Sequence, residues 1–367
     1  MSQDLLFWYD ENKRELPWRA TEQRKVTTYE TWLSEIMLQQ TRVETVKSYF
    51  MAFTKKFPTI FELANASQDE VMELWAGLGY YSRARTLHAC AKKVVEEYQG
   101  KFPKKSEELQ KLPGVGPYTS AAIASISFGE SIVAIDGNLH RVISRLYAHK
   151  KDREHSFTLG QNIIDTEHAG DFNQALMDLG SSICMSKNPK CEICPLSSHC
   201  KAFLSNRVAE FPLKKKKKPV PQVLVLSAIL ILEDEVLLCK RPSKGLFGGL
   251  LENPSFWMSD ADSSKKIAKV TLDEKKKLLK EKWKEEFAMD IEIQNHCGKL
   301  VHKLTHRHLY TDVFIVVGNV PTSSNFYEDV LFQSPNKLSQ VSTFCEKTVA
   351  LYNKIKKEGQ QLSLFST

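Results

Sequence analysis

The stretch CMSKNPKCEICPLSSHC, residues 184–200, contains four of the eight cysteines of the chain: Cys184, Cys191, Cys194 and Cys200. Only Cys191 and Cys194 form a close pair, whereas structural zinc sites are more often built from two such pairs. Iron–sulfur clusters are also bound by four thiolates, with ligand spacings that vary between families. Two disulfides would require an oxidising compartment, yet residues 1–20 contain acids among their apolar residues and no secretory signal. The spacing therefore favours an iron–sulfur cluster over zinc. Together with the lack of a secretory signal, it favours either of these over disulfides.

Length and composition indicate a soluble protein with more than one domain. A chain of 367 residues exceeds what one hydrophobic core usually holds, so we expect two domains. Hydrophobic residues make up 42% and charged residues 26%, which is ordinary for a soluble globular protein. No apolar run is long enough to cross a bilayer, so we expect no membrane partner. The net charge of +7 permits a polyanionic partner but does not demonstrate one.

The clearest domain boundary is a lysine run, Lys214–Lys218, that is flanked by Pro212 and Pro219. Adjacent like charges repel and proline disfavours both helix and sheet, so residues 211–222 are expected to form an extended, solvated linker. The run could bind phosphate groups or act only as a tether, and both interpretations stay open. The expected domains are residues 1–210 and 223–355, followed by a C-terminal tail, residues 356–367.

The two expected domains differ in the periodicity of their apolar residues. Before the linker, apolar positions between residues 29 and 40 step by three and four, and Thr27 with Glu30 forms a capping box at the start of that helix. After the linker, β-rich runs and one charged helix are expected: strands at 223–232, 236–239 and 309–317, and a helix at 263–287. The fold class is therefore multidomain, with an all-α first domain and an α/β second domain.

The segment Leu112–Gly116, with Gly114 and Gly116, has the form of a helix–hairpin–helix turn. The two glycines allow a tight turn and a close approach to a ligand. The helix that follows from Thr119 would point its free N–H groups outward, where a phosphate oxygen can accept them. An ordinary turn between two antiparallel helices is the alternative, and such a turn alone is weak evidence.

Two carboxyl groups are candidates for catalysis. Asp136 ends the apolar run 133–135 just before a helix, where it could cap that helix or face a developing cation, with Asn138 beside it. Glu35 lies between the apolar Trp32 and Ile36 at the edge of a buried helix face, where desolvation would raise its pKa. Two carboxyls in different environments are the usual equipment for cleaving a glycosidic bond.

Together these features resemble the MutY-type adenine DNA glycosylases of the endonuclease III superfamily. The resemblance covers essentially the whole chain and rests on Leu16–Arg19, Ser34–Thr41, Gly77–Tyr81, the hairpin, Ile135–Asn138, Phe172–Gly180 and the cysteine loop. It implies removal of adenine mispaired with 8-oxoguanine in double-stranded DNA, and also from A:G mispairs, which leaves an abasic site. It further implies a [4Fe-4S] cluster on the four cysteines, a helix–hairpin–helix domain with a Nudix-like second domain, a monomer, and a cytoplasmic, nucleoid-associated location.

The resemblance also assigns roles to residues of the first domain. Glu35 corresponds to the acid that protonates adenine N7, and Asp136 to the carboxylate that stabilises the oxocarbenium ion. Asn138 and Tyr118 correspond to residues that support Asp136. In addition, two residues correspond to those that wedge into the duplex as adenine flips out: Gln40 and Tyr80.

Tyr118 separates this chain from a close relative. Bifunctional endonuclease III relatives carry a lysine after the hairpin, which attacks the sugar as a Schiff-base nucleophile. The tyrosine cannot form that imine, so we expect base removal without efficient strand cutting.

The second domain resembles the Nudix-like module that reads 8-oxoguanine. Residues 245–250 match its glycine-rich segment, while residues 284–287 keep two acids of a magnesium-binding box whose upstream part is missing. We therefore expect binding, not hydrolysis. The lesion-reading loop has Leu304 in place of phenylalanine and Thr305 in place of serine, followed by His306.

Three other functions were weighed against adenine removal. A bifunctional glycosylase/lyase for oxidised pyrimidines is disfavoured by Tyr118 and by the second domain. A DNA-damage sensor without turnover is disfavoured by the intact pair Glu35 and Asp136. A nucleotide hydrolase centred on the second domain is disfavoured by its broken glutamate box.

Overall fold

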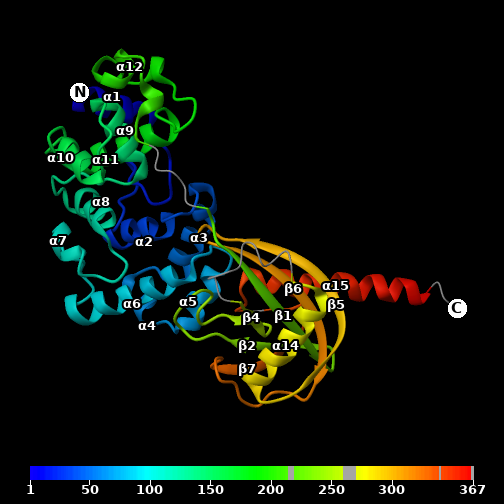
Figure 1. The fold of residues 1–367 in the computed structure, drawn as a ribbon. Helices are drawn as coiled ribbons and strands as arrows, with labels where there is room; N and C mark the ends of the chain where they lie inside the picture. Colours follow the sequence, from blue (N-terminus) through cyan, green and yellow to red (C-terminus); the bar gives the residue numbers. More distant parts are fainter. Residues whose placement is uncertain (214–218, 259–269, 339, 365–367) are drawn as a thin grey trace. The chain divides into compact units, whose positions relative to one another are not determined.

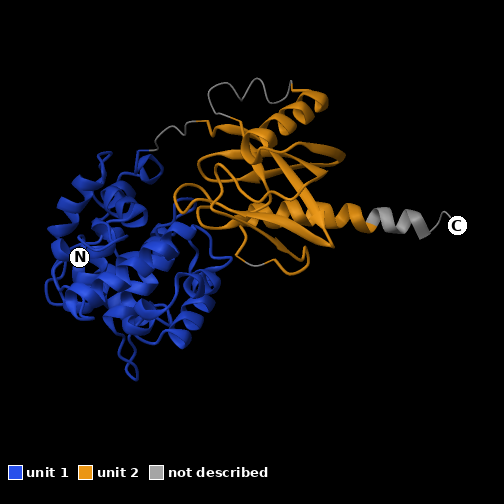
Figure 2. Cartoon of the chain, turned by 90° about the horizontal axis from the view of Figure 1, so that it is seen from below, with its two compact units in different colours: residues 1–216 blue, residues 217–367 orange. Residues whose placement is uncertain are grey.

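The chain divides into two compact units, residues 1–216 and 217–367, as Figure 2 shows. The computed structural model describes residues 1–213, 219–258, 270–338 and 340–364 (Figure 1). Lys214–Lys218, the run with an open role in binding phosphate, lie outside the described residues. No helix among the described residues combines the length and the apolar character needed to span a membrane.

Unit 1 is helical, as expected, with one isolated β-bridge between Thr21 and Arg24. Its α-helices are α1 (Ser2–Asn12), α2 (Thr28–Leu38), α3 (Val43–Lys56), α4 (Ile60–Asn65), α5 (Gln68–Trp75), α6 (Tyr81–Tyr98), α7 (Ser106–Leu109), α8 (Pro117–Phe128), α9 (Gly137–Tyr147), α10 (Arg153–Gln161), α11 (Ala169–Ser182) and α12 (Lys201–Leu204). Three short 3-10 helices lie near the cysteines and the end of the unit: η1 (Cys191–Ile193), η2 (Ser197–His199) and η3 (Val208–Glu210).

Helix α2 lies in the interior of unit 1. The predicted capping box is present, because the Thr27 hydroxyl accepts from the Glu30 N–H while the Glu30 carboxylate accepts from the Thr27 N–H. Every residue of α2 from Thr31 to Met37 is buried. The expected helix was too long at its C-terminal end: α2 stops at Leu38, and Gln40 has a left-handed backbone. The helix thus places Glu35 in the interior, and the two glutamines that follow Leu38 lie beyond its end.

Helix α8 packs closely against α2 and α11 because one stretch of it is built from small residues, Thr119–Ser125 with a single isoleucine. A Cβ added to Gly170 on α11 would lie 3.0 Å from the Ser125 carbonyl oxygen, so a larger residue would push against the backbone of α8 at this crossing. Pro117 occupies the first turn of α8, where its missing N–H costs no helical hydrogen bond. The close packing places the start of α8, directly after the hairpin, beside α2.

Unit 2 is an α/β domain around a seven-stranded mixed sheet. The strand order is β3-β2-β1-β6-β5, with β4 paired to β1 and β7 paired to β2; β1 and β6 are parallel. The elements are β1 (Gln222–Leu232), β2 (Glu235–Lys240), β3 (Leu251–Glu252), β4 (Ser255–Trp257), α14 (Leu272–Phe287), β5 (Ile291–Lys303), β6 (His308–Gly318), β7 (Asp329–Gln333) and α15 (Thr343–Leu364). The three expected strands are confirmed as β1, β2 and β6.

Two separate cores cover the two faces of this sheet. Leu226 and Leu230 of β1 pack with Trp283 of α14, whereas Ile229 packs with Val349 of α15. Figure 1 shows the two helices on opposite sides of the strands. A strand that is buried on both faces has apolar residues at consecutive positions, which explains the nearly uninterrupted apolar sequence of residues 223–232.

The start of the expected helix in unit 2 was wrong, and part of the expected C-terminal tail is helical. Helix α14 begins at Leu272, not at residue 263, because Thr271 and Glu274 form a capping box that starts it there; residues 263–269 lie outside the described residues. The expected tail from residue 356 is largely a continuation of α15, which extends to Leu364. Residues 365–367 lie outside the described part of the chain.

Replacement of Trp283 by alanine is expected to lower the free energy of unfolding of unit 2 by about 3–5 kcal/mol, because the indole fills the core under α14 and is fully buried. Leu272→Ala, on the exposed first turn of the same helix, should change it by less than about 0.5 kcal/mol. Chemical denaturation of the two variants checks this expectation, and equal losses would contradict the assignment of the core.

Candidate active site

Two adjoining hollows in unit 1 share the residues predicted to carry the chemistry. Both are lined by Glu35, Tyr118 and Asp136, and the smaller one also by Asn138. The larger one extends to the hairpin glycines Gly114 and Gly116 and to Gln40. The structure therefore brings together four predicted catalytic residues that are spread over 104 positions of the chain.

The carboxyl group of Glu35 is withdrawn from water. Its residue is 6% exposed, and burial raises its pKa to about 7. This value includes three smaller contributions: the Tyr118 hydroxyl and the Arg19 guanidinium lower the pKa, and the negative charge of Asp136 raises it. A carboxyl with this pKa is protonated in a substantial fraction at neutral pH, as general acid catalysis requires.

Asp136 occupies the N-cap of α9, as its sequence position allowed. Its Oδ1 accepts from the N–H of Asn138 at 2.8 Å and of Leu139 at 2.7 Å. These bonds satisfy donors that a helix start leaves free, so the capping role is real. Both use the same oxygen, and Oδ2 accepts no hydrogen bond from the described residues. Asp136 can therefore cap α9 through Oδ1 while its carboxylate also lines the cavity.

Asn138 is held by an arginine that also reaches the cysteine loop. Arg141 donates from Nη1 to Asn138 Oδ1 at 3.0 Å, from Nη2 to the Gly180 carbonyl at 2.7 Å, and from Nε to the Cys184 carbonyl at 2.9 Å. The amide oxygen of Asn138 is therefore engaged, and its NH2 group remains the available donor. Sequence reasoning missed Arg141, because its three acceptors lie 3, 39 and 43 positions away.

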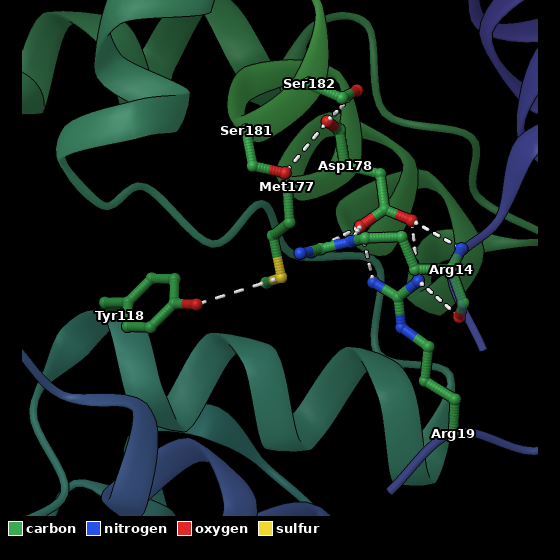
Figure 3. A network of polar contacts seen from close by, with 7 residues as sticks. All are labelled: Arg14, Arg19, Tyr118, Met177, Asp178, Ser181 and Ser182. Carbon is green, nitrogen blue, oxygen red and sulfur yellow. Dashed lines mark hydrogen bonds and ion pairs between the residues drawn. The ribbon is translucent and has the colours of Figure 1, made fainter. Parts of the chain in front are cut away.

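The Tyr118 hydroxyl lies beside Glu35 and points toward the Met177 sulfur at 3.8 Å (Figure 3). Burial raises its pKa well above 10, and the charges of Glu35 and Asp136 act in the same direction. The phenol therefore stays protonated and serves as a donor, not as a nucleophile.

A buried ion-pair network stands behind the site. Asp178 is 1% exposed, and both its oxygens accept from Arg19, at 2.6 and 2.9 Å, while Arg14 donates to it from Nε at 2.7 Å (Figure 3). Burial raises the pKa of Asp178, but the two arginines outweigh burial and hold it below its usual value. Arg19 also lines the cavity, where its charge limits the rise of the pKa of Glu35. This network was not predicted.

The two predicted wedge residues share a strained backbone. Gln40 has φ 59° and Tyr80 has φ 51°, and both side chains are exposed, Tyr80 to 43%. A left-handed conformation costs a residue other than glycine about 1–2 kcal/mol. Such strain is typical of functional positions that the surrounding structure holds in place. Gln40 lines the larger hollow; Tyr80 does not.

One wall of the larger hollow comes from α10, which no motif predicted. Arg153, Glu154 and the 38% exposed Phe157 line it. Arg153 makes no hydrogen bond or ion pair with another described residue, and its Nη2 lies 3.5 Å from the position a Cβ on Gly137 would take. A free cation and an exposed aromatic ring at the mouth of a cavity suit a phosphate and an apolar sugar or base.

The four cysteines of residues 184–200 line one small cavity, and all four are free thiols. Among the described residues, no group of three or more His, Cys, Asp or Glu side chains is arranged to hold a single metal ion. Zinc would draw the four sulfurs close together, at about 2.3 Å from one ion, whereas a four-iron cluster binds each thiolate to a different iron. Arg145 donates to Cys184 Sγ at 3.3 Å. The residues fit a cluster.

In unit 2, Thr305 and His306 are exposed in the turn between β5 and β6, which closes through a bond from the Leu304 N–H to the Arg307 carbonyl. Leu304 packs against a small apolar core that contains Phe344. The loop therefore rests on a rigid base while its two polar side chains face outward.

The two acids of the partial magnesium box are engaged by neighbours. Glu286 accepts hydrogen bonds from the Ser324 hydroxyl and the Phe326 N–H, and Glu285 pairs with Lys282. The carboxylate of Glu286 is thus bound by the loop that precedes β7.

Comparison with known proteins agrees with this geometry. Residues 33–162 match the HhH-GPD superfamily of base excision DNA repair proteins, residues 184–200 the iron–sulfur binding domain of endonuclease III, and residues 227–343 the NUDIX domain. An adenine DNA glycosylase of Arabidopsis thaliana is 38% identical over 85% of the chain, which spans 56% of that relative's length. One from Buchnera aphidicola subsp. Baizongia pistaciae is 34% identical, with 91% of each chain covered. A thermostable thymine-DNA glycosylase has a similar structure, with 28% identity, a TM-score of 0.52, and coverage of 56% of this chain and 95% of that one.

Replacement of Cys194 by alanine is expected to reduce the iron bound per chain to a small fraction, because it removes one of the four thiolates. The matched control is Cys90→Ala, a buried thiol of α6 outside the cavity, which should leave the iron content unchanged. Elemental analysis of the purified variants measures the effect. Full iron retention by the Cys194 variant would contradict the ligand assignment.

Proposed function

The chain belongs to the adenine DNA glycosylases of the HhH-GPD superfamily, which hydrolyse N-glycosyl bonds, and we propose that it removes adenine opposite 8-oxoguanine. We further propose that it acts on A:G mispairs and that it is monofunctional, so that the product is an abasic site in an intact strand. The observation that carries the proposal is the buried Glu35, with its pKa of about 7, in one cavity with Asp136.

The two carboxyls have complementary tasks. Glu35 donates its proton to N7 of adenine, so the base leaves as a neutral molecule with the electron pair of the broken C1′–N9 bond. The side chain of Asp136 stabilises the oxocarbenium ion that forms at C1′. Water then adds to C1′, and the proton it releases returns to Glu35. Asn138 and Tyr118 act as donors that hold the pair in position.

The absence of an amine nucleophile at position 118 supports a monofunctional reaction. A lysine there would form an imine with the opened sugar and prepare strand cleavage. The Tyr118 hydroxyl cannot form an imine, and its raised pKa keeps it protonated. Hydrolysis of the glycosidic bond is then the complete reaction.

The target bond is inaccessible while adenine is stacked, so the base must be extruded into the cavity. The hairpin glycines and the start of α8 would hold the backbone phosphates, together with Arg153, which lines the same hollow. Gln40 and Tyr80 would fill the space that the base leaves in the duplex.

Unit 2 is proposed to read the lesion without hydrolysing a nucleotide. The Thr305 hydroxyl and the His306 ring are exposed and able to meet a base edge. The engagement of Glu286 by Ser324 and Phe326 supports binding over hydrolysis, because the carboxylate is already in use.

The experiment that tests this function is single-turnover cleavage of a duplex with adenine opposite 8-oxoguanine, worked up with and without alkali. We expect breaks only after alkali, and none in a duplex with adenine opposite thymine. Breaks without alkali would show lyase chemistry and contradict the role of Tyr118. Tight binding without base release would indicate a damage sensor.

In the same assay, Glu35→Gln is expected to lower the rate of base release by about 10²–10⁴-fold, the usual contribution of a general acid, with DNA binding retained. Glu73→Gln, an exposed glutamate of α5, is the matched control and should react at the wild-type rate. Retained activity in the Glu35 variant would refute the assignment of the acid.

Thr305→Ala is expected to reduce the preference for 8-oxoguanine over guanine by roughly 2–10-fold, the equivalent of one hydrogen bond. Thr322→Ala, an exposed threonine of the same unit, should leave the preference unchanged. The ratio of the single-turnover rates on the two duplexes measures the effect, and an unaltered ratio for Thr305→Ala would exclude its hydroxyl as a reader of the lesion.

A further inference from the structure

Arg83, in the first turn of α6, donates hydrogen bonds to two separate segments of unit 1. Its Nη1 donates to the carbonyl oxygens of Ile36, at 3.1 Å, and Met37, at 2.8 Å, as well as to that of Gln39. Its Nη2 donates to the Thr41 hydroxyl at 2.9 Å and to the Gly79 carbonyl at 3.4 Å. One guanidinium thus joins the end of α2 to the loop between α5 and α6.

The acceptors surround the two strained wedge residues. Gln39 and Thr41 are the neighbours of Gln40 on either side, and Gly79 directly precedes Tyr80. The guanidinium also lies 5.3 Å from the centre of the Tyr80 ring, and at the same distance from the centre of the fully buried Trp75 ring. Arg83 therefore contacts Tyr80 itself as well as the residues that fix both strained backbones.

The environment of Arg83 offers it no carboxylate. It forms no salt bridge with a described residue, and burial lowers its pKa to about 10, so it stays charged at neutral pH. A buried cation requires compensation, which here comes from carbonyl dipoles and two aromatic faces. The planar guanidinium can meet several acceptors at once, whereas the ammonium of lysine cannot reach them in the same geometry.

We propose that Arg83 is a positioning residue that holds Gln40 and Tyr80 as one preformed wedge, so that extrusion of the base depends on it. The inference rests on the proposed function and adds the element that prepares the protein for base extrusion. Left-handed backbones at residues other than glycine relax unless neighbouring contacts fix them. Without Arg83 the two side chains would lose their fixed separation, and each would have to be ordered during flipping.

A different role is also consistent with the same bonds. Arg83 caps the C-terminal end of α2, which carries Glu35 four residues before Gln39, so it could act only by positioning the acid. The two roles differ in the step they affect. A misplaced acid slows bond cleavage in every substrate, whereas a loosened wedge slows only substrates whose adenine must be pulled from an intact stack.

The test compares Arg83→Lys with the wild type on two substrates under single-turnover conditions. The first is a duplex with adenine opposite 8-oxoguanine; the second has the same pair inside a bubble of mismatches, where the base is already unstacked. We expect the variant to be slower by about tenfold or more on the duplex and within about threefold of wild type on the bubble, because unstacking has been supplied. The fluorescence of 2-aminopurine placed at the target position should rise less with the variant than with the wild type.

Arg207→Lys, an exposed arginine of unit 1, is the matched control and should match the wild type on both substrates. Thermal melting checks that the variants are folded. If Arg83→Lys does not fold, Thr41→Val removes one acceptor of Arg83 without changing the side-chain size and should show a smaller defect on the duplex only. The double variant of Arg83→Lys and Tyr80→Ala should be slowed by less than the product of the two single effects, since both act on one wedge.

An equal defect of Arg83→Lys on duplex and bubble would overturn the proposal in favour of a role in positioning Glu35. Wild-type rates on both substrates would overturn it as well. Failure of the wild type to release adenine from either substrate would instead refute the proposed function, and the wedge with it.

Discussion

The chemistry of this protein depends on the removal of one carboxyl group from water. Glu35 lies in a helix whose residues from Thr31 to Met37 are all buried, and burial is the main cause of its raised pKa. The capping box at Thr27 begins this helix, and the small residues of α8 allow the close packing beside it. Asp136 raises this pKa in the same direction as burial, while Tyr118 and Arg19 lower it. The fold of unit 1 thus sets the pKa of one acid.

Arginines join the segments of the chain that surround the active-site cavity. Arg19 and Arg14 bind Asp178 behind the cavity, and Arg141 joins Asn138 to the first cysteine of the cluster loop. Arg145 donates to both the carbonyl and the sulfur of Cys184. A planar guanidinium with several donors suits such junctions between distant segments. The cysteine loop is therefore bonded through Arg141 of α9 to Asn138, which lines the active-site cavity, although the cysteines line a separate cavity.

Local signals in the sequence predicted the local parts of the structure. The capping box of α2, the cap at Asp136, the hairpin and the strands of unit 2 depend on residues close together in the chain, and the structure contains each of them. The bonds of Arg83 and Arg141 and the network around Asp178 join residues up to 164 positions apart, so no local pattern reveals them. No sequence pattern distinguishes Phe157, and only the fold exposes it at the cavity. The predicted start of the helix at residue 263 was wrong because charged residues typical of a solvent-exposed helix occur on both sides of the cap at Thr271. Their composition alone therefore marks no boundary there.

The pH dependence of adenine release in a single turnover shows whether Glu35 is the acid, because it reports the protonation of the group that donates the proton. A carboxyl with a raised pKa is active in its protonated form, which is present below that pKa and lost above it. The account predicts a rate that falls as pH rises through about 7, by roughly tenfold per pH unit beyond it. A rate that stays constant from about pH 6 to about pH 9 would contradict the account, because Glu35 would then not be the acid that drives the departure of the base.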